Sequence, residues 1–209
     1  MQLGSVAAIF RYPVKALRAE TLAATVVLAD GLEGDRTSAL VVTTKGHARS
    51  GQTFRGKEHP RLHTLRSSND GIREAAAAGV GTTLTAGGRH FDVHPISLIF
   101  DTWLAELATM AGRDIEAVRF RPNLVATAAP GFAQREAELV GTRLRVGGVA
   151  LTVIKPITRC VTPSYDLSSG ERDMHIARAL AVDRANIMGI YCQVATPGRI
   201  ALGDAVLRV

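Results

Sequence analysis

The stretch RLRVGGVALTVIKPITRCVTP, residues 143–163, decides the fold class of this chain. Branched and apolar residues dominate segments 143–146 and 149–154, and a pair of glycines separates the two segments. This composition favours β-strands, which accommodate branched side chains well. Two prolines, Pro156 and Pro163, exclude a helix interior for the rest of the stretch. The stretch therefore predicts two short strands followed by an irregular segment that carries Cys160.

Similar strand-like segments recur along the whole sequence, whereas few segments have helical periodicity. The predicted strands are 5–10, 21–28, 40–44, 124–127, 143–146, 149–154, 187–194 and 205–209. The predicted helices are 69–79, 97–110 and 173–183, of which 97–110 has the clearest apolar stripe. Because helices and strands do not alternate, a doubly wound parallel sheet is disfavoured. A β-barrel with peripheral helices is the architecture that fits this pattern.

Composition limits the class of protein and of partner. The 209 residues are 46% hydrophobic and 21% charged, as in a globular protein with a sizeable core. No signal peptide and no membrane-spanning apolar segment are evident, so we expect a cytoplasmic protein without a membrane partner. The net charge of +6 favours anionic ligands. No nucleic-acid partner is expected, because the basic residues are dispersed and aromatic residues make up only 5% of the chain.

Cys160 is the first candidate for chemistry. It lies next to Arg159 and follows an apolar strand-like run. A cysteine beside a fixed positive charge is a better nucleophile, and a better ligand for a soft metal ion, than an isolated cysteine. The alternative is that Cys160 is a small buried hydrophobic residue, as most lone cysteines are. The second cysteine, Cys192, is expected in the core, and two cysteines do not make a disulfide framework.

Several basic residues lie beside prolines or glycine turns. In the motif RFRPN, a strand entry would point Arg119 and Arg121 to the same side, and Asn123 can both donate and accept hydrogen bonds. The planar fork of arginine suits phosphate. The motif RYPVK ends at Lys15 and the motif GLEGDR ends at Arg36, each in reach of an anion. The alternative for each motif is a solvated surface charge.

Seven motifs, taken together, resemble those of the MOSC family, which is named for the C-terminal domain of molybdenum cofactor sulfurases. In chain order they are YPVK, GLEGDR, FRGKEHPRL, RFRPNLV, TRCVTPSYDLSSG, GIYCQV and PGRIALGD. Each motif is short, but all seven occur in the family's order between residues 12 and 204. The resemblance covers the MOSC domain and the small β-rich part that often precedes it.

The resemblance implies a mainly β fold with a few peripheral helices and a closed β-barrel of complex topology. Residues 1–95 would form the N-terminal β-rich part and residues 96–209 the MOSC core, together one compact unit. The resemblance also implies a molybdenum–pterin cofactor (molybdopterin), with Cys160 as catalytic residue and metal ligand. The phosphate end of the cofactor would be held by Lys15, Arg36, Arg121 and Asn123. Thr158 would hydrogen-bond the cofactor and Tyr191 would line its pocket.

The sequence departs from the family pattern at three points. Ala16 follows the YPVK lysine, where the family often has serine or glycine. Val140 stands before the glycine of a turn where tryptophan is common. No cysteine set for an iron–sulfur cluster is present, so electrons would come from an external electron donor protein.

Two functions remain open at this stage. The favoured one is a molybdenum-dependent oxidoreductase that removes oxygen from an N-hydroxylated base or a related small-molecule substrate, with the basic loop 45–59 as a lid. The alternative is a persulfide carrier, or a cofactor-handling protein without its own redox reaction. The oxidoreductase is favoured because no pyridoxal-phosphate desulfurase domain, which full sulfurases carry upstream, is present. A barrel that has lost its cofactor, with Cys160 in its core, is a third interpretation.

Overall fold

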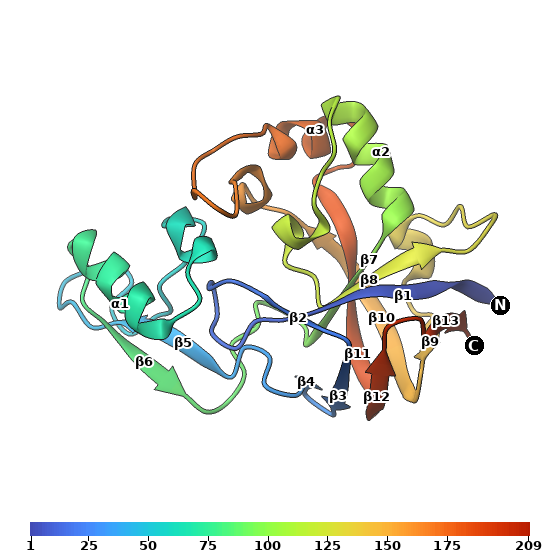
Figure 1. Ribbon diagram of the computed structural model, residues 1–209, viewed down its shortest axis with the longest axis horizontal. Helices are drawn as coiled ribbons and strands as arrows, with labels where there is room; N and C mark the ends of the chain where they lie inside the picture. The colour runs from blue at the N-terminus through green and yellow to red at the C-terminus, as the bar shows by residue number, and fades with distance from the viewer.

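In the computed structural model of the chain, which describes residues 1–209, seven strands close a β-barrel (Figure 1). Each strand pairs with the next one around the circle, and β13 pairs back to β1. The pairing of β7 with β8 is parallel and the others are antiparallel. This architecture confirms the expected mainly β fold with a closed barrel. The barrel strands, in order, are β13 (Ala205–Arg208), β9 (Arg143–Val146), β10 (Val149–Thr158), β11 (Ile187–Thr196), β7 (Ile96–Phe100), β8 (Leu124–Ala128) and β1 (Gln2–Arg11).

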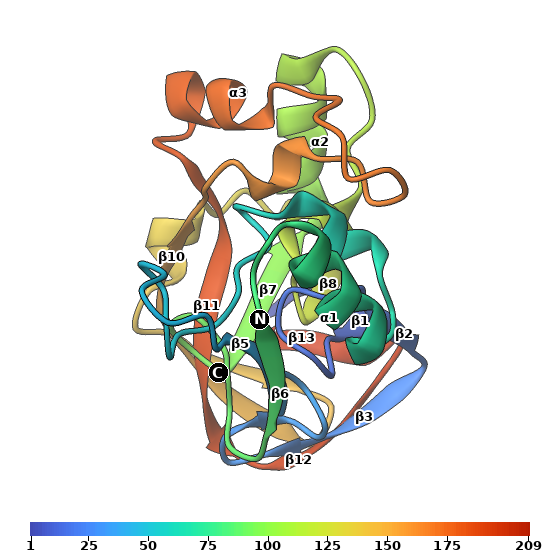
Figure 2. The ribbon, with the colours of Figure 1, turned by 90° about the vertical axis from the view of Figure 1, so that its left-hand side faces the viewer.

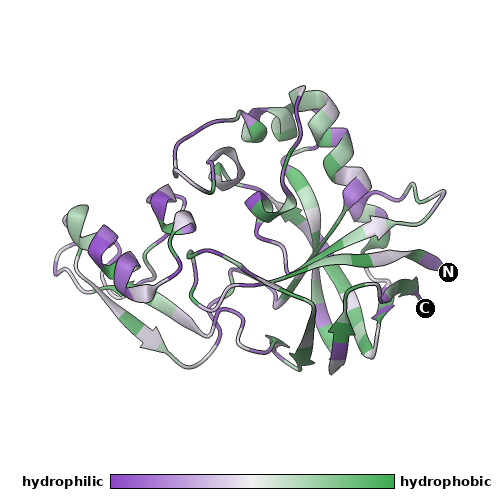
Figure 3. Ribbon diagram, viewed as in Figure 1, coloured by the Kyte–Doolittle hydropathy of each residue, from purple (hydrophilic) through white to green (hydrophobic).

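The main hydrophobic core has 30 buried residues, which come from the barrel strands and from the helices and loops packed against them. Leu3, Val6 and Ile9 of β1 belong to the same core as Leu98 of β7 and Ile190 of β11. Figure 3 shows hydrophobic residues concentrated along these strands. The N-terminal strand is therefore an integral part of the barrel, and its burial helps to fix the ends of the strands that border the site.

Four short strands lie outside the closed barrel. The predicted strand 21–28 is interrupted at Ala23, so that its first part extends the barrel sheet beside β1 and its second part pairs elsewhere. The second part forms the middle of a three-stranded sheet. These strands are β2 (Glu20–Leu22), β3 (Ala24–Leu28), β4 (Gly31–Leu32) and β12 (Gly198–Ala201).

The predicted helix 97–110 is partly wrong, because its first residues form strand β7. All five residues of β7 are buried, as a central strand between two neighbours requires, and such a continuous apolar run mimics a helical stripe. Helix α2 (Asp101–Ala111) starts only after this strand and ends at Gly112, which has φ +68°. Helix α3 (Ile176–Asp183) packs beside α2. No α-helix here combines the length and apolar character that a membrane crossing requires.

A small lobe, residues 38–86, stands beside the barrel with a core of its own (Figures 1 and 2). Leu40, Phe54, Leu62 and Ala75 belong to this core of eight buried residues, to which the segment after β1 adds Ala16 and Leu17. The lobe contains β5 (Ser38–Val42), the 3-10 helix η1 (Pro60–Thr64), α1 (Ser68–Ala77) and β6 (Thr82–Ala86). Three further 3-10 helices belong to the barrel part: η2 (Ala117–Phe120), η3 (Glu136–Leu139) and η4 (Thr162–Ser164). The lobe and the barrel face each other across the cavity described next.

Candidate functional site

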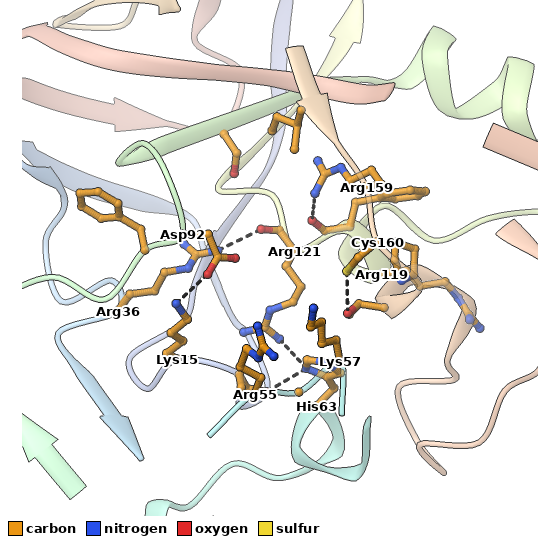
Figure 4. Close-up of a pocket in the computed structure, with 18 of the residues that line it drawn as sticks. Lys15, Arg36, Arg55, Lys57, His63, Asp92, Arg119, Arg121, Arg159 and Cys160 are labelled. Carbon is orange, nitrogen blue, oxygen red and sulfur yellow. Dashed lines mark hydrogen bonds and ion pairs between the residues drawn. The ribbon is translucent and has the colours of Figure 1, made fainter. Parts of the chain in front are cut away.

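A cavity of about 310 Å³ lies between the small lobe and the barrel (Figure 4). All seven residues expected from the sequence line it: Lys15, Arg36, Arg121, Asn123, Thr158, Cys160 and Tyr191. Further residues line it that the sequence had not assigned, among them Arg55, Gly56, Lys57, His63, Asp92 and Arg159. The volume is in the range of small-molecule and cofactor sites. The fold thus gathers residues of six sequence motifs into one place.

Tyr12 supports the basic wall of the cavity, which Lys15, Arg36 and Arg121 form. Its side chain is fully buried, and burial raises its pKa to about 12. The Cζ atoms of Arg36 and Arg121 lie 4.5 Å and 4.2 Å from the centroid of its ring. The Tyr12 hydroxyl donates to the carbonyl of Pro122 at 3.2 Å, and the Tyr12 N–H donates to Asp35 Oδ1 at 2.7 Å. These contacts hold both guanidinium groups in place. Asp35 also pairs with Arg36, whereas Arg121 has no carboxylate partner.

Arg121 is a half-buried cation with spare hydrogen-bonding capacity. Its backbone has φ +53°, and its carbonyl accepts a hydrogen bond from Arg36 Nη2 at 3.1 Å. Burial lowers the pKa of Arg121 to about 10, and its buried Nη2 has no hydrogen-bond partner. A buried donor without a partner costs free energy, and a ligand that accepts from it removes this cost. The structure thus presents Arg121 as a preformed donor to an anion.

His63 supports the same wall from the small lobe. Its Nδ1 lies 2.8 Å from the carbonyl oxygen of Ala16 and 3.2 Å from Arg121 Nη1. A carbonyl only accepts and a guanidinium only donates, so the tautomer of the ring decides which of the two Nδ1 bonds to, and Nε2 has no partner. Burial and the nearby Arg121 lower the pKa of His63 to about 3, so the ring is neutral at physiological pH. The contact also holds Ala16 in a left-handed conformation with φ +72°, a conformation that favours glycine.

Gly56 lets the His63 ring approach the loop, which gives a first testable prediction. A Cβ atom at Gly56 would overlap the His63 ring. We expect Gly56→Ala to displace the ring and to lower the free energy of unfolding by about 1–3 kcal/mol. Urea unfolding of the full chain measures this change. Gly148→Ala is the matched control, because its Cβ would meet nothing closer than 3.6 Å; equal stability changes in the two variants would contradict the prediction.

Cys160 lies at the end of β10, where the chain leaves the barrel. The thiol is exposed, and its Sγ lies 3.2 Å from Thr162 Oγ1. Arg159 beside it is fixed through its guanidinium, which donates to the carbonyls of Met188 at 2.8 Å and Phe120 at 2.7 Å. Burial lowers the pKa of Arg159 to about 10, and its buried Nη2 has no partner. The interpretation of Cys160 as a core residue is therefore wrong, whereas Cys192 is fully buried as expected, and burial raises its pKa to about 12.

The remaining expected residues differ in whether their polar side-chain groups already have hydrogen-bond partners in the protein. Asn123 is 1% exposed, and its side chain ties β7 to β8: its Oδ1 accepts from the Ser97 N–H and hydroxyl, each at 3.1 Å. Thr158 is exposed at the end of β10 and has no side-chain hydrogen bond. Burial raises the pKa of Tyr191, whose ring lies 5.7 Å from that of His94 between centroids. Thr158 and Tyr191 can still bind a ligand, whereas Asn123 mainly holds the strands together.

Arg119 and Arg121 do not point to the same side, contrary to the sequence expectation. The segment forms the 3-10 helix η2 instead of a strand entry, so the alternation of a strand does not apply. Arg119 Nη1 and Nη2 each lie 2.8 Å from a carboxylate oxygen of Asp173, and Nη1 also donates to the carbonyl of Tyr165 at 3.0 Å. Figure 4 shows the guanidinium of Arg119 turned away from that of Arg121. Arg119 thus lines the cavity with its guanidinium held in an ion pair, whereas the guanidinium of Arg121 keeps a free donor.

Arg55 and Lys57 come from the polar loop of the small lobe. Lys57 forms no ion pair, and the buried Nε of Arg55 has no hydrogen-bond partner. Figure 4 shows both side chains below Cys160, on the lobe side of the cavity. The motif FRGKEHPRL contains both residues and was the only sequence signal for them. The cavity is thus basic on the lobe side as well as on the barrel side.

The chemistry of the lining suits an anion and a soft metal centre. The unpartnered buried N–H groups of Arg55, Arg121 and Arg159 can each donate to a ligand oxygen. An exposed thiol at the other side of the cavity is a soft ligand. The structure has no group of three or more His, Cys, Asp or Glu side chains that could hold a metal ion. A metal bound here would therefore need ligands supplied by a bound molecule in addition to Cys160.

Comparison with protein families gives matches along the whole chain. The MOSC N-terminal beta barrel domain matches residues 3–97, and the MOSC domain matches residues 87–207. The chain belongs to the MOSC family. A comparison with curated proteins finds no match to this MOSC sequence.

Two solved structures share the fold of this MOSC protein. The crystal structure of the YUAD protein from Bacillus subtilis is 18% identical, with a TM-score of 0.55 over 97% of this chain and 93% of that chain. The crystal structure of YiiM from Escherichia coli is 12% identical, with a TM-score of 0.52 over 100% of this chain and 70% of that chain. At these identities the likeness concerns the fold alone.

Proposed function

We propose that this MOSC protein binds the molybdenum–pterin cofactor and is a molybdenum-dependent oxidoreductase for N-hydroxylated or related small molecules. One observation carries the proposal. An exposed thiol, Cys160, shares a single cavity with buried guanidinium donors that have no partner in the protein. A ligand that combines an anionic group with a metal centre accounts for both features at once.

The residues of the cavity fit this cofactor. The cofactor bears a phosphate, and the wall of Lys15, Arg36 and Arg121 offers the positive charge and planar donors that phosphate prefers. Cys160 would be the protein ligand of molybdenum, a role that thiolate chemistry suits. The cofactor would supply the electron chemistry, as cofactors of this kind do.

The protein residues would bind, orient and shield. Thr158, with its free hydroxyl, would hydrogen-bond the cofactor beside Cys160, and Tyr191 would close the same wall. Arg159 lines the site, and its Nη2, which has no partner in the protein, would donate to an oxygen near Cys160. Arg55 and Lys57 of the loop 45–59 would cover the opening and limit the access of water. Electrons would come from an external donor protein, and the cytoplasm is the expected location.

The test is the molybdenum and pterin content of the full chain after expression in a host that makes the cofactor. We expect about one molybdenum and one pterin per chain, since there is one cavity with one exposed thiol. The loaded protein should then reduce N-hydroxylated bases in the presence of an external reductant. Metal and pterin contents near zero in a folded chain would remove the proposal.

A persulfide carrier is the second candidate, because the Cys160 thiol is exposed at a basic cavity. An accessible thiol beside cationic groups also suits persulfide formation. Mass spectrometry after incubation with a cysteine desulfurase tests this role. A gain of one sulfur on Cys160 in a chain that holds no molybdenum would favour the carrier; an unmodified Cys160 would count against it.

A further inference from the structure

The basic wall already holds an anion that belongs to the chain itself. Asp92 Oδ1 lies 2.6 Å from the ammonium nitrogen of Lys15. Both residues line the cavity, and Figure 4 shows the Asp92 carboxylate between Lys15 and the barrel wall. Asp92 is the only carboxylate of the lining, against seven lysine and arginine residues.

Three cations act on this carboxylate. Partial desolvation by the nearby cavity residues would raise the pKa of Asp92, but Lys15, together with Arg36 and Arg121, lowers it overall. These are the three cations that form the proposed phosphate clamp. The Asp92 carboxylate therefore lies in the field that a phosphate would use, and the two anions repel each other there.

Asp92 is free to leave this position. Its side chain is 74% exposed, so a rotation about its own bonds brings the carboxylate into water. The segment between β6 and β7 that carries Asp92 has no helix or strand, and it follows Gly87 and Gly88, both with positive φ. Its backbone is anchored nearby, because the His90 N–H donates to the Arg36 carbonyl at 2.8 Å. The side chain can thus move while the segment stays in place.

We infer that Asp92 is a built-in competitor, which occupies the Lys15 end of the anion clamp until a phosphate-bearing ligand displaces it. This inference rests on the proposed function, since it needs the clamp to bind phosphate. The apparent dissociation constant of any anion is the intrinsic one divided by the fraction of chains in which Asp92 has left. Asp92 thus lowers the affinity of the clamp for every anion, so that a weakly binding anion stays unbound at a concentration at which a tightly binding one is held.

The competition makes an unusual prediction about ligand charge. Removing a competitor raises the affinity of every anion by the same factor, whatever its charge, because the fraction of open clamps is common to all ligands. Removing a remote negative charge instead helps a dianion about twice as much in free energy as a monoanion. A pair of probes that differ mainly in charge therefore separates the two cases.

The experiment is calorimetric titration of the full chain, prepared without cofactor, with methyl phosphate and with dimethyl phosphate. At about pH 8 methyl phosphate is a dianion, because its second pKa is near 6, and dimethyl phosphate is a monoanion. We expect Asp92→Asn and Asp92→Ala each to raise the affinity for both probes about fivefold, as loss of a partly exposed ion pair implies. In a Lys15→Met background the gain should disappear.

Asp30→Asn is the matched control, because Asp30 pairs with Arg89 at 2.7 Å outside the cavity lining. It should leave both affinities unchanged. An unchanged or weaker affinity in the Asp92 variants would overturn the inference, as would a gain of about 25-fold for the dianion against fivefold for the monoanion. Methyl phosphate that fails to bind any variant would remove the clamp itself, and the inference with it.

Discussion

Cys160→Ser is expected to lose molybdenum and, with it, reduction of N-hydroxylated substrates. The serine hydroxyl is a much harder and less acidic ligand than a thiol, so it does not replace the thiolate at a soft metal centre. We expect less than about a tenth of the wild-type molybdenum per chain, since a loss of 1.4 kcal/mol in binding already lowers affinity tenfold. The fold should survive, because Cys160 is exposed and belongs to neither hydrophobic core.

Metal analysis and pterin fluorescence of the purified chain measure the effect directly. Thiol labelling of the folded chain prepared without cofactor gives the control: iodoacetamide should modify Cys160 and spare Cys192, which is fully buried and whose pKa burial raises to about 12. The Cys160→Ser variant should therefore take up no label unless it is denatured. A variant that keeps its molybdenum and its activity would contradict the assignment of Cys160 as ligand.

The sequence predicted those site residues whose type has a specific chemistry, a thiol or a fixed positive charge. Cysteine, lysine and arginine at turns marked the two sides of the cavity, and the motif order assigned them to one family. All of these residues line the cavity. The closed barrel was predictable for a similar reason, since short branched segments without alternating helices leave few other architectures.

The rest depended on contacts that no local pattern contains. The pairing of Asp92 with Lys15 joins residues that are 77 positions apart, and the sequence around Asp92 has no feature that indicates it. His63 acquires its role from burial against Gly56 and Ala16, which only the docking of the small lobe provides. Strand β7 was missed because a fully buried strand and a buried helix face have the same apolar composition.

The two arginines of RFRPN give the clearest contrast between sequence and structure, and a second large expected effect. Arg121→Met should weaken methyl phosphate binding at least about tenfold, because it removes a buried donor of the clamp. The same variant should be as stable as the wild type, or up to about 2 kcal/mol more stable, because an unpaired, half-buried cation is replaced by an apolar side chain of similar length. Calorimetric titration and urea unfolding measure the two quantities.

Arg119→Met should do the reverse. Its side chain is 5% exposed and pairs with Asp173 at 2.8 Å, so its loss leaves a carboxylate and a carbonyl without their donor. We expect the free energy of unfolding to fall by about 2–3 kcal/mol, somewhat less than for a fully buried pair because Asp173 is 28% exposed. Phosphate affinity of the folded variant should stay unchanged. A loss of affinity in both variants, or a loss of stability in both, would show that the two arginines act as one unit, which the separate partners in the structure argue against. If the two variants behave as expected, two arginines two positions apart have opposite roles: Arg119 is paired within the protein and stabilises the fold, and Arg121 is left unpaired for a ligand.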